Sequence, residues 1–209
     1  MIMKKNVILI ALCALLIAGV GLVYAGTRTP VDDIVERIAA ECAGMKTMKC
    51  DFTQISTVPL MDEKQISSGK MIYRQPSALK WIYTEPFNYS LIIEDDNISV
   101  DTDQGHTELD NDASRMVRGL TGIVLGCMSG QNLKDKRLFQ TTVTEQDNEW
   151  VAVLIPQRRE MKRYFSEIVM VFAPETSLLK RLTMKDQNGG STEVIISNVS
   201  INGDYEADW

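Results

Sequence analysis

The chain has 209 residues, 44% of them hydrophobic, and 22 basic residues stand against 28 acidic ones for a formal net charge of −6. A chain of this length can bury the core of one domain. The acidic balance argues against a nucleic-acid-binding protein and against tight adsorption to anionic lipid surfaces, because both partners are themselves negatively charged.

The first 25 residues are typical of a secretory signal peptide. Lys4 and Lys5 supply the positive start, residues 7–23 are almost unbroken apolar sequence, and compact residues ending at Ala25 offer a cleavage site. An uncleaved membrane anchor is the alternative, since about 17 apolar residues could just cross a bilayer. Cleavage is favoured, and it leaves residues 26–209 as a single exported domain with a formal charge of about −8.

The four cysteines give no metal or redox motif. Cys13 lies inside the apolar leader, behind a poor lipidation box, so the protein is not expected to be a lipoprotein itself. Cys42, Cys50 and Cys127 remain after cleavage, and an odd number leaves at least one of them unpaired or intermolecular. A Cys42–Cys50 disulfide is one option. Buried, unpaired thiols are the other, and this is what we expect for Cys127. Because His106 is the only histidine and no Cys-x-x-Cys occurs, we expect no zinc and no cofactor.

Residues 30–43 are predicted to form the first helix. Thr29 is a capping residue, Pro30 suits the first turn, and the acidic residues after it suit the positive helix start. Apolar residues recur at helical spacing as far as Cys42, and Gly44 is placed to end the helix.

From the end of this helix to about residue 110, apolar and polar residues alternate. Alternation with frequent turn signals predicts an antiparallel sheet with one apolar and one wet face. The alternating segments are residues 49–55, 69–73 and 79–83, separated by turn signals at 75–77, 85–88 and 94–97. Strands resume at residues 138–146, 150–155, 167–173, 178–185 and 191–199, with a hairpin turn at 186–190.

Residues 113–128 break the alternation and are predicted to form one or two helices. Glycines at positions 119, 122 and 126 weaken these helices, because each glycine lowers helix stability by roughly 1 kcal/mol relative to alanine. A soft amphipathic segment is expected to act as a lid that plugs an empty cavity and swings away to admit a ligand. The lid residues are Met116, Leu120, Ile123, Val124 and Met128.

Large apolar side chains share one parity of the predicted strands. They are Met71, Tyr73, Leu79, Trp81, Tyr83, Leu91, Ile93, Met170, Phe172, Leu182 and Met184. Two modest helices cannot cover so long a face, and methionine suits irregular surfaces. We therefore predict an α+β, mainly β fold: an incomplete antiparallel β-barrel or strongly curved sheet with helices as a lid over an apolar cavity. The alternative explanation is that these apolar side chains form an ordinary, fully packed core.

Several motifs resemble those of the periplasmic outer-membrane lipoprotein carriers, the LolA family. Residues 48–54 end in Phe-Thr-Gln after a first helix, and residues 69–81 contain a glycine strand, a proline turn and Trp81. Glu85-Pro86, Leu91-Ile92-Ile93 and residues 150–156 also match, so the resemblance covers roughly residues 30–200.

The resemblance implies an incomplete barrel of about eleven strands with helices as a lid over an acyl-binding cavity. It also implies a periplasmic location and lipoprotein acyl chains as cargo. The implied partners are an inner-membrane lipoprotein release complex and an outer-membrane acceptor.

The chain departs from the family in two places. The family has arginine immediately before the turn proline, where it ties the lid shut, whereas Gln75 stands there and Arg74 comes one residue earlier. A shift of one residue reverses the face of a strand, but Gln75 can still donate two hydrogen bonds, so both are candidates for the lid latch. The end at Trp209 lacks the family's proline-containing terminal segment, which leaves open the handover to the usual membrane partners.

The sequence thus favours a monomeric carrier over an enzyme. Ser129 lacks a nucleophile-elbow context, and no acid–base–nucleophile set is visible. The acidic pairs Asp95-Asp96 and Asp101/Asp103 are typical of turns and solvated strands, with calcium binding as an alternative. A second alternative keeps the same fold as an envelope sensor or scaffold that binds a protein partner instead of carrying lipid.

Overall fold

A computed structural model describes residues 30–59, 64–94, 97–108, 122, 126 and 131–206. Within these residues, eleven strands form one antiparallel sheet in the order β6-β5-β4-β3-β2-β1-β11-β10-β9-β8-β7. The strands are β1 (Thr47–Thr57), β2 (Gln65–Arg74), β3 (Ala78–Glu85), β4 (Tyr89–Glu94), β5 (Asn97–Thr102), β6 (Gly105–Glu108), β7 (Phe139–Gln146), β8 (Glu149–Pro156), β9 (Glu167–Phe172), β10 (Leu179–Lys185) and β11 (Ser191–Ile201). The helices are α2 (Pro30–Gly44), α4 (Gln131–Lys134) and α5 (Arg159–Lys162).

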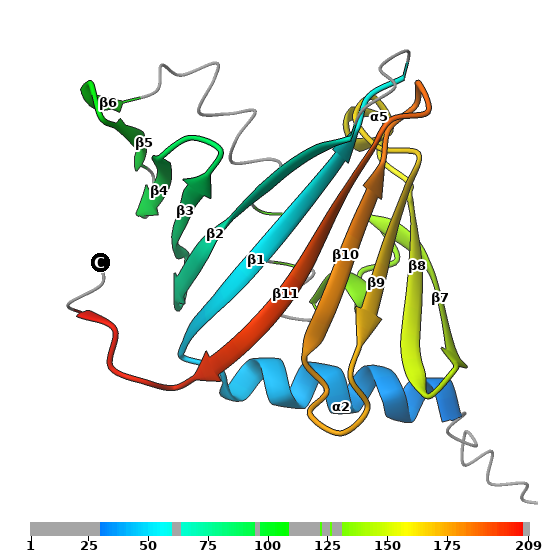
Figure 1. The fold of residues 1–209 in the computed structure, drawn as a ribbon. Coiled ribbons are helices and arrows are strands. Elements are labelled where there is room, and N and C mark those ends of the chain that lie inside the picture. The colour runs from blue at the N-terminus through cyan, green and yellow to red at the C-terminus, as the bar shows by residue number, and fades with distance from the viewer. Residues whose placement is uncertain are drawn as a thin grey trace, which may run out of the picture.

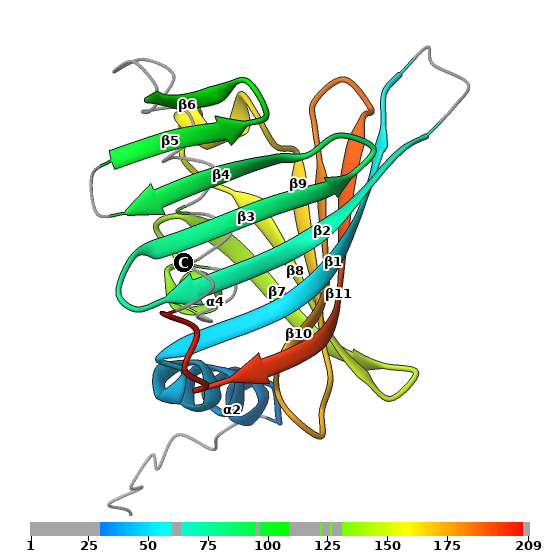
Figure 2. The same ribbon diagram turned by 60° about the vertical axis from the view of Figure 1, so that its left-hand side comes forward.

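The sheet curls strongly and does not close, because its edge strands β6 and β7 do not pair with each other (Figure 1). Strands β2 to β6 form one wall and strands β7 to β10 form the other, with β1 and β11 joining them (Figure 2). Helix α2 crosses one end of this half-barrel and α5 lies at the opposite end (Figure 1). The expected mainly β, incomplete-barrel fold is confirmed.

Most predicted elements begin and end within a few residues of the observed ones. Helix α2 has acidic residues in its first turn and ends at Gly44, as expected from the sequence. The short helices α4 and α5 and the separate strands β5 and β6 were not distinguished by the sequence pattern. Of the predicted lid, Gly122 and Gly126 are helical, while the lid side chains Met116, Leu120, Ile123, Val124 and Met128, with Cys127, lie outside the described residues.

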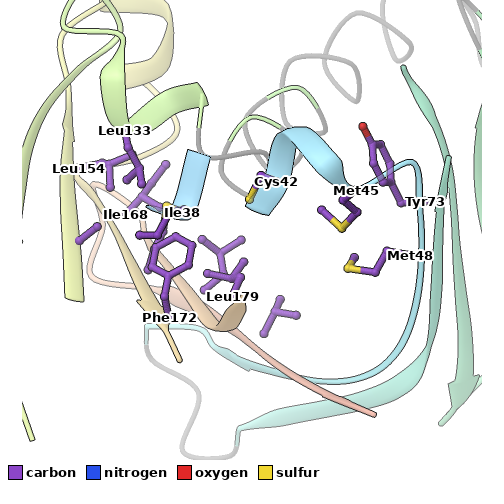
Figure 3. Packing of buried hydrophobic residues seen from close by; sticks show 14 of the residues in the cluster. Ile38, Cys42, Met45, Met48, Tyr73, Leu133, Leu154, Ile168, Phe172 and Leu179 are labelled. Carbon is purple, nitrogen blue, oxygen red and sulfur yellow. The ribbon is translucent and has the colours of Figure 1, made fainter. Parts of the chain in front are cut away.

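Helix α2 provides the packing between the two walls. Ile38 is fully buried and lies toward Phe172 and Leu154, whereas Met45, directly after the helix, lies toward Met48 of β1 (Figure 3). Each large apolar side chain that is fully buried contributes roughly 1.5–3 kcal/mol. None of the described helices is long and apolar enough to cross a bilayer.

Cys42 and Cys50 are buried, and the structure contains no disulfide between them. Burial raises the pKa of Cys42 to about 11 and that of Cys50 to about 12. The neighbouring carboxylates Glu41 and Asp51 are the second, smaller cause of these raised pKa values, because a negative charge nearby disfavours the thiolate.

These thiols are predicted to react slowly in the folded protein. The thiolate is the nucleophile, and a raised pKa lowers its population at pH 8 by about a hundredfold relative to a free cysteine. Alkylation of Cys42 and Cys50 by iodoacetamide, followed by peptide mass spectrometry, should be slower by that factor or more than in guanidinium. Fast labelling of either peptide under native conditions would contradict the burial of its thiol.

Gly69 allows β2 and β3 to approach closely where their register shifts between Ser68 and Gly69. A Cβ atom at this position would lie 1.8 Å from the carbonyl oxygen of Ile82 and 3.0 Å from the Phe52 ring. Neither neighbour can move easily, since one is backbone and the other is a buried core ring.

Gly69→Ala is therefore predicted to lower the free energy of unfolding by about 2 kcal/mol or more, as overpacked sites do. Urea denaturation measures the change. Gly44→Ala is the matched control, because a Cβ there meets nothing within 4 Å, and it should change stability by less than about 0.5 kcal/mol. Equal stability of the two variants would show that the β2–β3 pair relaxes around the added methyl group.

Candidate functional site

The strand register places all eleven predicted cavity residues on the inner face of the sheet. Met71 lies opposite Trp81, and Trp81 lies opposite Leu91. Tyr73, Leu79 and Ile93 form a second such row. On the other wall, Leu182 lies opposite Met170, and Phe172 lies opposite Leu179. The eleven side chains belong to one continuous apolar cluster, to which α2 also contributes.

Burial divides these residues into two regions. Seven of the eleven are buried: Met71, Tyr73, Leu79, Ile93, Met170, Phe172 and Leu182. Met170 and Phe172 are 0% exposed, so they offer no surface to a ligand in this conformation. Trp81, Tyr83, Leu91 and Met184 are only partly buried, and three of these four belong to the neighbouring strands β3 and β4. The apolar surface that a ligand could cover is therefore concentrated on β3 and β4.

Trp81 and Tyr83 of β3 belong to an aromatic cluster with Phe52 and Tyr89. The Phe52 ring centroid lies 4.7 Å from that of Trp81 and 5.2 Å from that of Tyr83. Tyr83 and Tyr89 stack with their centroids 4.3 Å apart. Tyr89 is 38% exposed, so the cluster runs from the core to the surface along the inner face. Aromatic pairs at these separations hold one another in place.

Two polar atoms in the aromatic cluster differ in how they are satisfied. The Tyr83 hydroxyl donates to Gln54 Oε1 at 2.9 Å, and burial raises the pKa of Tyr83. Trp81 Nε1 is buried, and no acceptor among the described residues lies in hydrogen-bond geometry to it. The Tyr83 hydroxyl is nevertheless close enough for the indole N–H to lower the Tyr83 pKa, against the larger effect of burial. An unsatisfied buried donor costs about 1–3 kcal/mol, which a ligand acceptor would recover.

The inner face reaches the surface at the end of the sheet that carries α5. A pocket of about 170 Å³ lies there between the end of β1 and the start of β11. Its inner wall includes Ser56, Met184 and Thr192, which are aligned across three strands. Phe165 and Val58 line its rim.

Neither latch candidate faces the inner surface in the same way as Tyr73. Arg74 donates from Nη2 to Glu94 Oε1 at 3.2 Å and from Nη1 to Glu206 Oε1 at 3.1 Å, so it holds the C-terminal tail against the sheet. Gln75 is exposed, and its backbone N–H donates to the carbonyl of Lys46 at 2.8 Å. The lid lies outside the described residues, so a latch between it and either side chain stays a prediction.

The polar residues considered for catalysis or metal binding do not converge on the inner face. His106 Nδ1 lies 2.6 Å from Asp101 Oδ1, and both side chains are exposed on β5 and β6. Asp95, Asp96 and Ser129 lie outside the described residues. Among the residues that the structure describes, no three His, Cys, Asp or Glu side chains group as a metal site.

Sequence reasoning missed part of the inner surface. The sequence predicts Phe52 as part of an alternating strand and of a family motif, but not as an inner-face residue, although Met48, Cys50 and Phe52 alternate with half-exposed residues in β1. That alternation could have placed Phe52 opposite Gly69 and beside Trp81. Nothing in the sequence pattern signals the hydrogen bond between Gln54 and Tyr83, which depends on strands 29 residues apart.

Comparison with solved structures gives the fold. MucB is similar with a TM-score of 0.52 and 8% identity over 85% of this chain and 61% of that chain. MucB in the MucA/MucB complex of Pseudomonas aeruginosa gives a TM-score of 0.51 and 10% identity over 86% and 60%. The chain thus spans about 60% of MucB. A LolA superfamily protein from Nitrosomonas europaea matches with a TM-score of 0.45 and 10% identity over 84% of this chain and 95% of that chain.

No curated protein matches the sequence. The family model of the outer membrane lipoprotein carrier protein LolA, in contrast, matches residues 43–209, a range that includes every described strand of the sheet. The chain belongs to the LolA family.

Proposed function

We propose that the protein is an envelope carrier that binds the acyl chains of lipoproteins on its inner face and delivers them toward the outer membrane. One observation carries the proposal: the half-barrel keeps Trp81, Tyr83 and Leu91 partly uncovered on its inner face, beside a buried indole N–H without an acceptor among the described residues. An acyl chain would cover the apolar surface, and an ester or amide carbonyl at its head would accept from Trp81 Nε1. This chemistry is binding, with no covalent step.

The two-region inner face suits reversible binding. A buried methylene contributes about 0.8 kcal/mol, so a palmitoyl chain enclosed along its whole length would gain roughly 12 kcal/mol and leave very slowly. Here α2 already fills the region around Met170 and Phe172, which leaves the aromatic cluster and its neighbours for the ligand. Partial coverage keeps the affinity within the range from which a carrier can release its cargo.

The lid extends this proposal to residues 113–128. We propose that a lid plugs the inner face of the empty protein and swings away when an acyl chain enters, with the side chains of Met116, Leu120, Ile123, Val124 and Met128. Opening the lid costs free energy that binding must supply, which lowers the net affinity further. Gly122 and Gly126, both in helical conformation, are the positions at which such a segment bends most easily.

A second function rests on the likeness to MucB, which has been solved in complex with MucA. In this case the inner face, or its rim, would bind a protein partner of the envelope instead of a lipid. The two functions predict different copurified material from the same cells: lipid or lipoprotein for the carrier, and a stoichiometric protein for the scaffold.

Substitutions on the two faces of β4 test acyl binding. Leu91 faces the inner surface and Ile92 the outer one, and both are partly buried. Leu91→Gln should weaken binding of a diacylated lipopeptide about five- to tenfold, because roughly 1 kcal/mol of apolar contact is lost. Ile92→Gln, the matched control, should leave the Kd within a factor of two. Displacement of a fluorescent fatty acid measures both.

Equal effects of the two substitutions, or no lipopeptide binding by the parent protein, would reject the acyl site. Copurification of one protein in stoichiometric amount, without lipid, would then favour the scaffold. Thermal melts of both variants check that a loss of binding is not a loss of folding.

The lid is tested by hydrogen exchange with and without bound lipopeptide. If residues 113–128 move on binding, their amides should change exchange rate by about tenfold or more, because local opening equilibria set those rates. The peptides of β8 and β9, which pack against α2, serve as the internal control and should stay unchanged. Identical exchange across residues 113–128 in both states would show that the segment is ordinary core.

A further inference from the structure

The segment after β8 concentrates positive charge in an acidic protein. Four basic residues occur within six positions, Arg158, Arg159, Lys162 and Arg163, with Glu160 as the one acidic residue among them. All four basic side chains are exposed, and Tyr164, which follows them, is 48% exposed. We refer to residues 158–164 as the basic segment.

Most cations on the strands have a counter-charge, whereas those of the basic segment have none among the described residues. Lys70, Arg137 and Lys185 pair with Asp51, Asp135 and Glu167. Lys180 and Arg181 also pair, through Glu149 and Glu193. None of the four cations in the basic segment forms an ion pair with a residue that the structure describes, although 28 acidic residues are available in the chain.

The basic segment is held rigidly against the sheet. The Gln187 side-chain amide donates to the carbonyl oxygens of Lys162 and Phe165 at 2.9 and 3.1 Å. Ser166 Oγ donates to the carbonyl of Asp186 at 3.0 Å, and its backbone N–H donates to that of Lys185 at 2.9 Å. Met161 packs against the core cluster. The four cations are therefore presented on a fixed support.

The segment lies beside the place where the inner face reaches the surface. Phe165 immediately follows it and lines the same pocket as the inward-facing Met184 and Thr192. Val58, which is 41% exposed, lines the other side of that pocket. Helix α5 and this rim lie at the end of the half-barrel away from α2 (Figure 1).

We propose that the basic segment docks the protein on a membrane leaflet that contains anionic phospholipid head groups, with the rim of the half-barrel turned toward the bilayer. Arginine and lysine bind phosphate oxygens, and a tyrosine ring next to them suits the bilayer interface. The net charge of −6 opposes adsorption of the molecule as a whole. The docking is accordingly weak and oriented, because the attraction is concentrated on this segment and opposed by the acidic remainder of the protein.

Sedimentation with phospholipid vesicles tests the docking and needs no acyl cargo, so it can fail while the carrier function stands. The protein, in the form to which the cell processes it, is mixed at low salt with two kinds of vesicle. One consists of phosphatidylcholine alone, and the other of phosphatidylcholine with about 30% phosphatidylglycerol. The triple variant Arg159→Gln, Lys162→Gln, Arg163→Gln removes three cations from the segment. The control triple variant Lys46→Gln, Lys134→Gln, Lys136→Gln removes three exposed lysines elsewhere, with the same change in net charge.

The expected result is partitioning onto the anionic vesicles that falls about tenfold or more in the segment variant and less than twofold in the control variant. Raising the ionic strength to about 0.5 M should abolish it, because the Debye length then falls to a few ångströms. An equal fall in both variants would mean that net charge alone governs binding and would overturn the proposal. Equal binding to neutral and anionic vesicles would also overturn it, because it would point to apolar contacts common to all three proteins. No binding at all would overturn it too and would leave the segment to an acidic protein surface.

Discussion

An antiparallel sheet that curls without closing has an inner face that its own strands cannot cover. Strands β6 and β7 are the two edges of the described sheet, and the inner face between them is apolar on nearly every strand. Apolar surface exposed to water is unfavourable in proportion to its area, so another element must lie on it. Helix α2 does this with Ile38 over the region of β8 to β10, and Met45, directly after the helix, lies near Met48 of β1. Farther along β3 and β4 than the buried Leu79 and Ile93, Trp81 and Leu91 are only partly buried.

Much of this arrangement could be predicted from the sequence because it depends on local periods. Strands such as β1 and β8 alternate between the two faces, so their parity identifies the inner residues without knowledge of the partners. Strand β6 has four exposed residues and α5 has four residues in all, so neither offers a period long enough to detect. The division of the inner face into packed and uncovered regions could not be predicted, because it depends on where α2 lies relative to strands more than 100 residues away.

Arg74 illustrates how a single residue of offset changes a role. Its neighbour Tyr73 faces inward opposite Leu79, so Arg74 projects on the other side of β2. There it binds Glu94 and Glu206, and the tail it holds is fixed further by Tyr205, whose hydroxyl donates to Ser200 Oγ at 2.7 Å. The ion pairs are partly exposed and contribute little individually. Their combined effect is to keep the last described residues on the outer face, away from the apolar surface.

The distribution of charge and apolar surface together favours a protein that binds its partners briefly. An acidic surface keeps the molecule from adsorbing broadly to anionic membranes, while one rigid basic segment beside the rim gives it a single attractive orientation. Likewise, α2 fills the deeper part of the inner face and leaves a limited apolar area around the aromatic cluster for a ligand. In both cases attraction is confined to a small part of the surface and opposed by the rest. Because the free energy of each contact is small, either one can be reversed without an energy source, as the proposed carrier function requires.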